Sequence, residues 1–247
     1  MKIIPLSEGA FTVDKTKKFV PFNKEGDDLQ QRPIGSLLVE VQPFCIITKT
    51  DVIVIDTGLG FRLPNGTLQI HQNLLNNGVN PLEVTKVLLS HLHKDHSGAI
   101  SLEDKVLGQH FISFPNATYY VNKEELLFGL DKKNTSYVQE DFDILTSLDR
   151  VILLEGNGVI DNYITYEVTG AHSPFHQVFW VEEDDQIVFF GGDVAPQLQQ
   201  MKNRFVAKYD FDGKKCMELR QQWWQMGEQQ KWIFLFYHDI KTPVFEF

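Results

Sequence analysis

The sequence predicts a single α/β domain, and three features of the chain support this. Short apolar runs such as Val52–Ile55 have the length and composition of buried strands. Strand, helix and strand patterns alternate along the chain, as they do in α/β folds. The 247 residues, 43% of them hydrophobic, are enough for one large core, and no repeat or Pro/Ser-rich linker divides them. We therefore expect one domain over residues 1–247.

The first third of the chain is predicted to be rich in strands. Turn-forming or charged stretches separate five segments of β-forming residues, 2–5, 10–13, 19–22, 36–40 and 44–49. The next run, Val52–Ile55, is apolar throughout, which is typical of a central strand that is covered on both faces. It ends at Asp56-Thr57-Gly58, and functional sites of α/β sheets lie at such strand ends. Asp56 could instead only cap the turn.

Helices and strands alternate in the middle of the chain. The spacing of Ile70, Leu74 and Leu75 predicts a helix over 68–77, and a short buried strand over 87–89 follows it. After a strand over 117–121, a capping-box pattern at 122–125 opens a helix that runs to Leu130. The apolar spacing in 136–148 predicts one more helix. The remaining strands are expected at 151–154, 164–168, 178–181, 187–190 and 233–237.

Residues 194–231 differ from the rest in being rich in glutamine, and we expect a helical, lid-like segment there. Its helix is predicted over 214–230, where an apolar stripe indicates packing more than a cofactor site: Cys216, Leu219, Trp223 and Met226. Several aromatic residues of the segment could receive an apolar chain of a substrate: Phe205, Tyr209, Phe211, Trp223 and Trp224.

Three histidines and one aspartate fall within six positions, at His91, His93, Asp95 and His96. Because side chains alternate along an extended segment, His91 and His93 point the same way and can bind one ion. Asp95 and His96 lie on the turning part of the loop, where they suit a second ion. Imidazole and carboxylate ligands together favour zinc. Iron and manganese remain possible with such ligands, whereas magnesium and calcium are less suited to them. Alternatively, these histidines could be solvated loop residues that bind no metal, but the size of the cluster disfavours this interpretation.

Three more candidate ligands stand on turns or at strand ends, at His172, Asp193 and His238. They bring the set to seven, about the number that two ions need. One zinc ion would be bound by His91, His93 and His172, and the other by Asp95, His96 and His238. Asp193 would bridge the two ions through its two carboxylate oxygens.

Composition and charge restrict the classes of partner. A net charge of -10 and a pI near 5.2 argue against a nucleic-acid groove, which needs a basic face. Neither a signal-peptide core nor a run of about 20 apolar residues is present, so we expect a cytoplasmic protein with no membrane partner. The two cysteines, Cys45 and Cys216, are predicted to be buried free thiols. We expect a small-molecule substrate; the oligomeric state stays open, with a homodimer among the options.

Five segments resemble, in order, the motifs of the metallo-β-lactamase superfamily. They are Asp56-Thr57-Gly58, His91-x-His93-x-Asp95-His96, Gly170-Ala171-His172 with His176, Gly191-Gly192-Asp193, and Tyr237-His238-Asp239. The resemblance spans residues 56–239. It implies an αβ/βα four-layer sandwich of two mixed β-sheets flanked by helices, with a dinuclear site at one sheet edge and the ligand pairing given above. Asp56 would then orient a histidine ligand, while His176 would support the ligands or be structural.

Differences from the branches of this superfamily point to a reaction class. Its true β-lactamases usually carry cysteine or serine where this chain has Asp193. The flavodiiron branch has a glutamate where His93 stands, which favours zinc and hydrolysis here, and glyoxalase II continues well past the last histidine. The chain looks most like the acyl-homoserine lactonase and methyl parathion hydrolase-like branches, although Pro196 stands where the lactonases have a tyrosine.

The expected reaction is hydrolysis of a carbonyl compound. Two zinc ions would lower the pKa of a bridging water towards about 7 and polarise the carbonyl oxygen of a lactone or ester. Asp95 would take up the proton of the attacking hydroxide and pass it to the leaving oxygen. Two kinds of alternative remain: a thioesterase or phosphotriesterase that uses the same site, and a binding module that holds the metal without catalysis.

Overall fold

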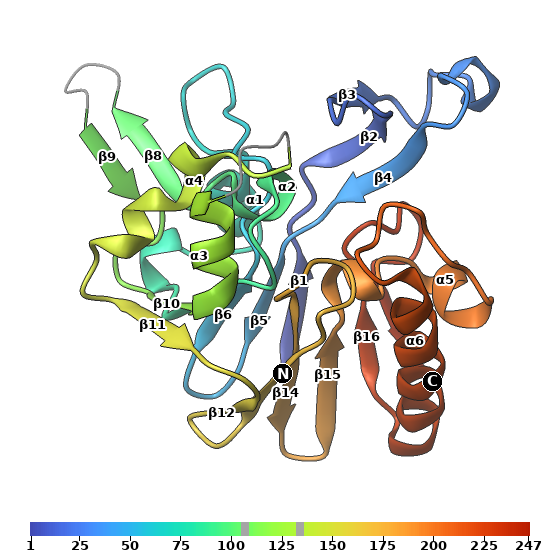
Figure 1. Cartoon of the computed structure of the whole chain (residues 1–247). Coiled ribbons are helices and arrows are strands. Elements are labelled where there is room, and N and C mark those ends of the chain that lie inside the picture. The colour runs from blue at the N-terminus through green and yellow to red at the C-terminus, as the bar shows by residue number, and fades with distance from the viewer. Residues whose placement is uncertain (105–108, 132–135) are drawn as a thin grey trace.

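The computed structural model describes residues 1–104, 109–131 and 136–247, and its main feature is a pair of facing six-stranded sheets (Figure 1). The first sheet has the order β1-β5-β6-β7-β10-β11. Its strands are β1 (Lys2–Pro5), β5 (Phe44–Ile47), β6 (Val52–Ile55), β7 (Lys86–Leu88), β10 (Thr118–Asn122) and β11 (Val151–Leu154). Strand β5 is antiparallel to β1 and β6, and the strands from β6 to β11 are parallel to one another.

The second sheet has the order β12-β13-β14-β15-β16-β17. Its strands are β12 (Gly158–Ile160), β13 (Ile164–Val168), β14 (Gln177–Glu183), β15 (Gln186–Phe190), β16 (Ile233–Leu235) and β17 (Val244–Glu246). The pair β15 and β16 is parallel, and the other pairs are antiparallel. Both large sheets are therefore mixed, as the resemblance implied.

Helices cover the outer faces of the two sheets, so that the molecule has four layers (Figure 1). Helices α1 (Gln69–Asn76) and α3 (Lys123–Asp131) pack on the first sheet, and α5 (Leu198–Lys202) and α6 (Gly213–Gln230) on the second. Alternation along the strands divides the core accordingly. Val54 faces the α1 layer, whereas Ile53 and Ile55 face the second sheet.

Two small sheets extend this sandwich. Strands β2 (Gly9–Val13), β3 (Phe19–Phe22) and β4 (Leu37–Val41) form an antiparallel sheet of order β3-β2-β4, which projects beyond one end of the large sheets (Figure 1). Strands β8 (Ser101–Asp104) and β9 (Gln109–Ile112) pair antiparallel and form the other small sheet. The sequence predicted β2, β3 and β4, but it did not predict β8, β9, β12 or β17.

The predicted helix over 136–148 is wrong in length. The structure has a short helix α4 (Gln139–Phe142) followed by a 3-10 turn, η3 (Asp143–Thr146). Phe142 breaks the helix because its backbone, at φ -136 and ψ -3, leaves the helical region. Phe142 and Leu145 are nevertheless buried in the core, as their spacing predicted.

Only half of the predicted capping box at 122–125 exists. The side chain of Asn122 accepts a hydrogen bond from the Glu125 backbone N–H at 3.0 Å. The Glu125 carboxylate does not return to Asn122. It accepts instead from the backbone of Leu92 at 3.1 Å, on the loop that carries the candidate ligands.

The segment 194–231 divides into two parts. Its larger part, α6, is a packing helix, since Cys216 and Trp223 are buried against the second sheet. Trp224 stacks on Phe245 of β17. The two tryptophans therefore cannot receive a substrate chain, and only residues before α6 can be lid-like. Both cysteines are buried and free, as predicted. Within the described residues, no helix has the length and apolar character needed to cross a membrane.

Candidate metal centre

Asp193 occupies the middle of a cluster formed by all seven candidate ligands. It lies on the 3-10 turn η4 (Gly192–Val194) that follows β15. Its Oδ2 is 3.2 Å from Nε2 of His172 and 4.0 Å from Nε2 of His91. Its Oδ1 is 3.1 Å from Nε2 of His96 and 3.0 Å from Nε2 of His238. The carboxylate thus divides its two oxygens between two groups of side chains.

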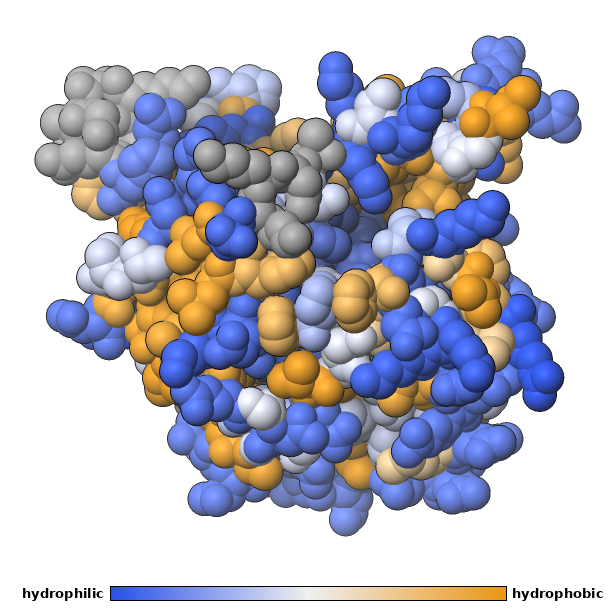
Figure 2. Space-filling view, viewed as in Figure 1, coloured by the Kyte–Doolittle hydropathy of each residue, from blue (hydrophilic) through white to orange (hydrophobic). Residues whose placement is uncertain are grey.

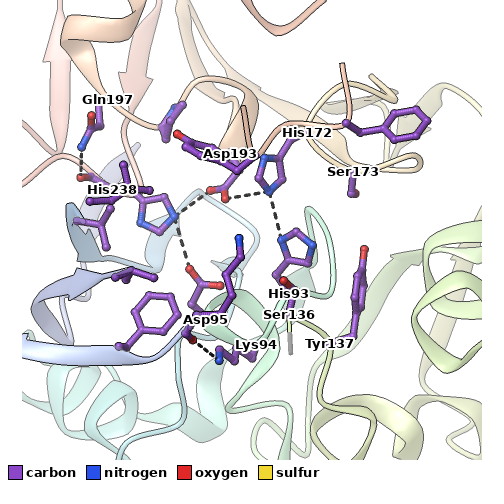
Figure 3. Close-up of a pocket in the computed structure, with 18 of the residues that line it drawn as sticks. His93, Lys94, Asp95, Ser136, Tyr137, His172, Ser173, Asp193, Gln197 and His238 are labelled. Atoms are coloured by element: carbon purple, nitrogen blue, oxygen red, sulfur yellow. Dashed lines mark hydrogen bonds and ion pairs between the residues drawn. The ribbon is translucent and has the colours of Figure 1, made fainter. Parts of the chain in front are cut away.

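The other ligands fall into the two groups that the sequence predicted. In the first, Nδ1 of His93 lies 3.0 Å from Nε2 of His91 and 3.2 Å from Nε2 of His172. In the second, Oδ2 of Asp95 lies 3.6 Å from Nε2 of His238 and 3.8 Å from Nε2 of His96. Figure 3 shows His93, Asp95, His172, Asp193 and His238 pointing toward one another from different elements.

The backbone positions these ligands at strand ends. His91 and His93 follow β7, His172 stands between β13 and β14, and His238 follows β16. Asp95 and His96 were expected on a turning loop, but they lie on the short helix α2 (Lys94–Ser97), with His93 as its N-cap. A helical turn rotates successive side chains by about 100°, which separates Asp95 and His96 from the direction of His93.

Four histidines are oriented by a hydrogen bond at Nδ1, which leaves Nε2 facing the cluster. Nδ1 of His96 is 2.7 Å from Asp56, and Nδ1 of His172 is 2.8 Å from Asp210. Nδ1 of His238 is 2.7 Å from the Glu40 carbonyl oxygen, and Nδ1 of His91 is 3.1 Å from Ser90 Oγ, which donates to Asp56. An acceptor at Nδ1 fixes the tautomer with a lone pair at Nε2, which is the form that binds a metal.

Asp56 supports the cluster without joining it. The residue has φ 56, in the left-handed region that non-glycine residues rarely adopt. Its side chain is fully buried, and besides His96 it accepts from the backbone and hydroxyl of Ser90, both at 2.7 Å. These contacts connect the end of β6 to the end of β7. A residue that only caps its own turn would not make them, so Asp56 has a wider role than a turn cap.

His176 also lies beside the ligands. It is fully buried, and its Nε2 accepts a hydrogen bond from the Asp193 backbone N–H at 3.2 Å. Gly192, at φ +49, allows this approach, since a Cβ there would be 2.6 Å from the same nitrogen. His176 therefore holds the turn that carries Asp193.

The donor set fits a pair of transition-metal ions. Among the described residues, buried His96 Nε2 and Asp193 Oδ1 lie 3.1 Å apart but form no well-directed hydrogen bond, which is costly unless a cation binds them. Burial, and then the neighbouring histidines, hold the pKa of His91 and of His93 well below the usual value, so both are neutral and able to bind a metal. Although burial opposes it, the imidazoles of His238, His96 and His172 hold the pKa of Asp193 well below its usual range.

Sequence reasoning missed four residues that support the cluster. Besides Asp210, these are Glu125, Tyr237 and Glu8. Buried Glu125 accepts from the hydroxyls of Tyr137 at 2.9 Å and Ser173 at 3.1 Å.

Tyr237 was recognised only as part of a motif. Its hydroxyl donates to the Asp95 carbonyl oxygen at 2.5 Å, and its ring stacks on His96 at 4.0 Å. Glu8 accepts from the backbone N–H of Leu59 at 2.5 Å, and burial raises its pKa to about 7. Neither Asp210 nor Glu8 belongs to a local motif, so the sequence carried no signal for them.

A pocket of about 610 Å³ opens above the cluster, and the surface is hollowed beneath the projecting sheet of β2, β3 and β4 (Figure 2). His93, Asp95, His172, Asp193 and His238 form its floor. Of the five aromatic residues expected to receive a substrate chain, Tyr209 and Phe211 line the pocket, and Phe205 and the two tryptophans do not. Pro196 is also in the lining, near the ligands.

Comparison with known proteins agrees with this geometry. Residues 38–227 match the family model described as the metallo-beta-lactamase superfamily. The chain is 30% identical over 115 residues to the N-acyl homoserine lactonase AttM of Azorhizobium caulinodans, and 33% identical over 115 residues to the AttM lactonase of Agrobacterium fabrum. Each match covers 42% of this chain and only 38% of the length of the relative.

Solved structures share the fold over nearly the whole chain. A structure described as a probable metal-dependent hydrolase from Staphylococcus aureus has a TM-score of 0.79 at 19% identity, covering 99% of this chain and 91% of its own. AidC, a dizinc quorum-quenching lactonase, has a TM-score of 0.71 at 16% identity, and the match covers 98% of this chain and 88% of AidC. The family match spans most of the described strands, and these likenesses confirm the expected four-layer fold. The chain belongs to the metallo-beta-lactamase superfamily and has the fold of that superfamily's hydrolases.

Proposed function

We propose that this protein is a dinuclear, zinc-dependent hydrolase that cleaves lactones or esters. The observation that carries the proposal is the position of Asp193, whose two oxygens each face a separate group of histidines at 3.0–3.2 Å. A carboxylate in this position can bridge two ions. His91, His93 and His172 would hold one ion, and Asp95, His96 and His238 the other.

The bound ions would supply an activated water and polarise a carbonyl oxygen. The residues of the chain supply the proton transfer. Asp95 is the one carboxylate of the second group, and it also lines the pocket. It can take a proton from the nucleophile and release it to the leaving oxygen. Tyr237 fixes the Asp95 backbone, so the carboxylate keeps its position during the transfer.

The pocket favours an acyl substrate. Apolar and aromatic side chains line its walls above the floor, including Phe19, Phe128 and Phe211. Pro196 offers no hydroxyl to a bound carbonyl group, whereas Tyr209 also lines the pocket, with its ring 6.2 Å from that of His172. Tyr209 is therefore our candidate donor. The names of the two AttM relatives support a lactone as the substrate.

The test is a substrate panel with the zinc-loaded protein and His93→Ala as the blank. Acyl-homoserine lactones and aryl esters should be hydrolysed with a higher kcat/KM than a glutathione thioester or a phosphotriester. A higher kcat/KM for the thioester or the phosphotriester would instead indicate that the protein is a thioesterase or a phosphotriesterase. Absence of turnover on every compound, with zinc bound, would instead indicate a non-catalytic metal-binding module.

A further inference from the structure

The pocket above the metal cluster has a basic wall, although the whole chain carries a net charge of -10. Three cationic side chains line it, Lys17, Arg32 and Lys94. Within the described residues, the only carboxylates in the lining are Asp95 and Asp193, both of them candidate metal ligands. Two divalent ions on the floor would add to the positive charge. The electrostatic potential in the pocket is therefore positive although the protein as a whole is acidic, and a positive potential attracts anions.

The position of Lys17 is fixed by its backbone. It ends the turn between β2 and β3 with φ 59, and its N–H donates to the Asp14 carbonyl oxygen at 3.0 Å. Asp14 also accepts from the backbone N–H of Thr16 at 2.8 Å. A left-handed conformation in a lysine is unfavourable and needs such support. The turn places Lys17 in the lining of the pocket, together with His93 and Asp95 of its floor.

Lys94 connects this turn to the metal cluster. It precedes Asp95 on α2, and its Nζ donates to the Lys17 carbonyl oxygen at 2.5 Å. Its ammonium also lies 5.7 Å from the ring centre of Phe19 on β3. Because Lys94 is held in this way, it acts as a positioning residue for Lys17.

Arg32 stands farther along the same wall, just before Ser36 and β4. Its Nε donates to the Leu29 carbonyl oxygen at 3.1 Å, which orients the guanidinium without neutralising it. No carboxylate of the described residues lies within ion-pair distance of Arg32 or Lys17, whereas Lys24, from the same part of the chain, pairs with Glu40 at 3.1 Å. Partly buried cations in a pocket without counter-ions are costly, and a bound anion would remove that cost.

Apolar side chains share this wall with the cations. Val13, Phe19, Leu37, Leu38 and Val39 come from β2, β3 and β4 and line the pocket together with Lys17 and Arg32. A ligand on this wall therefore meets an apolar surface as well as charge. That combination suits an acyl chain that ends in an anionic group.

Resting on the hydrolase function proposed above, we propose that the substrate is an acyl ester or lactone whose acyl chain carries a carboxylate. Lys17 and Arg32 bind that carboxylate, while the scissile carbonyl group lies on the metal floor. Arg32 can bind a carboxylate through two N–H groups, and Lys17 adds a point charge. The acyl chain covers the apolar residues of the same wall.

The test compares two esters that differ only at the end of the acyl chain, 4-nitrophenyl hexanoate and the mono-4-nitrophenyl ester of adipic acid. The zinc-loaded protein should prefer the adipate ester in kcat/KM. Lys17→Asn and Arg32→Gln should each reduce the adipate-to-hexanoate ratio by about tenfold, since each removes one charge from the carboxylate site. Asparagine tolerates the left-handed conformation at position 17. Lys18→Gln is the matched control, because Lys18 is exposed and outside the pocket, and it should leave the ratio unchanged.

A binding measurement gives a second readout that needs no turnover. Calorimetric titration with adipic acid monoamide should show weaker binding to Arg32→Gln and Lys17→Asn than to the wild type and Lys18→Gln. The difference should shrink as the salt concentration rises from about 0.01 M to about 0.15 M. Thermal melting of each variant checks that it is folded.

The outcomes separate this inference from the function on which it rests. If both esters are hydrolysed and the two variants keep the wild-type ratio and affinity, the carboxylate site is refuted while the hydrolase stands. If neither ester is hydrolysed but Arg32→Gln and Lys17→Asn weaken binding of the monoamide, the site stands and ester hydrolysis fails.

Discussion

Strands β6 and β7 have charged residues at both of their ends, and the two ends differ in how these residues are partnered. At the start of the strands, Lys86 forms an ion pair with Asp51 and another with Asp161 at 3.1 Å. Asp51 also accepts hydrogen bonds from Tyr163 at 2.5 Å and Thr85 at 2.7 Å. At the other end, Asp56 and His91 belong to a cluster in which, among the described residues, buried His96 Nε2 and Asp193 Oδ1 lie 3.1 Å apart without a well-directed hydrogen bond.

This difference separates stability from function. Charges that are paired within the chain hold the start of β6 and β7 together and need nothing more. At the cluster, histidine lone pairs and carboxylate oxygens point toward the same space and repel one another. A bound cation removes this repulsion and stabilises the arrangement. We therefore expect changes at the paired end to affect unfolding, and changes at the cluster to affect metal binding and turnover.

The largest effect is expected from Asp95→Asn. Loss of the proton acceptor should reduce kcat on the best ester or lactone by about 10²- to 10⁴-fold. Steady-state kinetics of the zinc-loaded variant measure this, with bound zinc determined in parallel. Asp185→Asn is the control, since Asp185 is exposed and lies outside the pocket. A kcat within twofold of the wild type would assign the proton transfer to another group.

Metal removal should give the next largest effect. The chelated protein should melt at a lower temperature, because a ligand at 100 times its Kd stabilises a folded protein by about 2.7 kcal/mol. Differential scanning calorimetry with and without chelator measures the change. The melting temperature of Asp193→Ala should change less on addition of the chelator than that of the wild type. Coincident curves for the wild type would mean that contacts within the chain preform the cluster.

Asp51→Asn should reduce stability without affecting catalysis. The variant weakens the partly buried pair with Lys86, which should lower the free energy of unfolding by about 1–3 kcal/mol. Urea denaturation gives that free energy, and the kcat of the folded variant should equal that of the wild type. A large fall in kcat would show that the two ends of the strands are coupled.

The stability difference between Asp51→Asn and the wild type should depend on pH. Burial alone would raise the pKa of Asp51, but hydrogen bonds from Lys86, Tyr163 and Thr85 lower it from 3.8 to about 2. A lowered folded-state pKa stabilises the fold above the ordinary value, and this contribution is lost as the pH falls toward 2. The difference should therefore narrow between about pH 5 and about pH 3 in urea titrations. A constant difference would show that the Asp51 charge does not contribute to it.

The same contrast explains which parts of the molecule the sequence could predict. The candidate ligands His91 and His93 were predictable because alternation within one short extended segment fixes their directions, whereas the helical turn that carries Asp95 was not predicted. Asp193 and His238 were predictable because each lies within three residues of the end of an apolar strand. The fully apolar run Val52–Ile55 likewise indicated a strand that is covered on both faces, and β6 lies between the helix layer and the second sheet.

Other parts of the site depend on contacts between distant segments. Asp210 reaches His172 across 38 positions from a loop without a pattern, and Lys17 reaches the pocket from a left-handed turn. Glu125 matched a local capping box, but the neighbouring loop binds its carboxylate instead. The wall of the pocket is built from such long-range contacts, so its charge could be seen only in the structure.

The most direct test of the central claim is the number of metal ions that the cluster binds. Zinc titration followed by elemental analysis should give two ions per chain for the wild type. Asp193→Ala should bind both ions more weakly, because its carboxylate faces both groups of ligands. A single ion per chain in the wild type, or loss of only one ion in Asp193→Ala with the other bound at full affinity, would contradict the bridging role of Asp193.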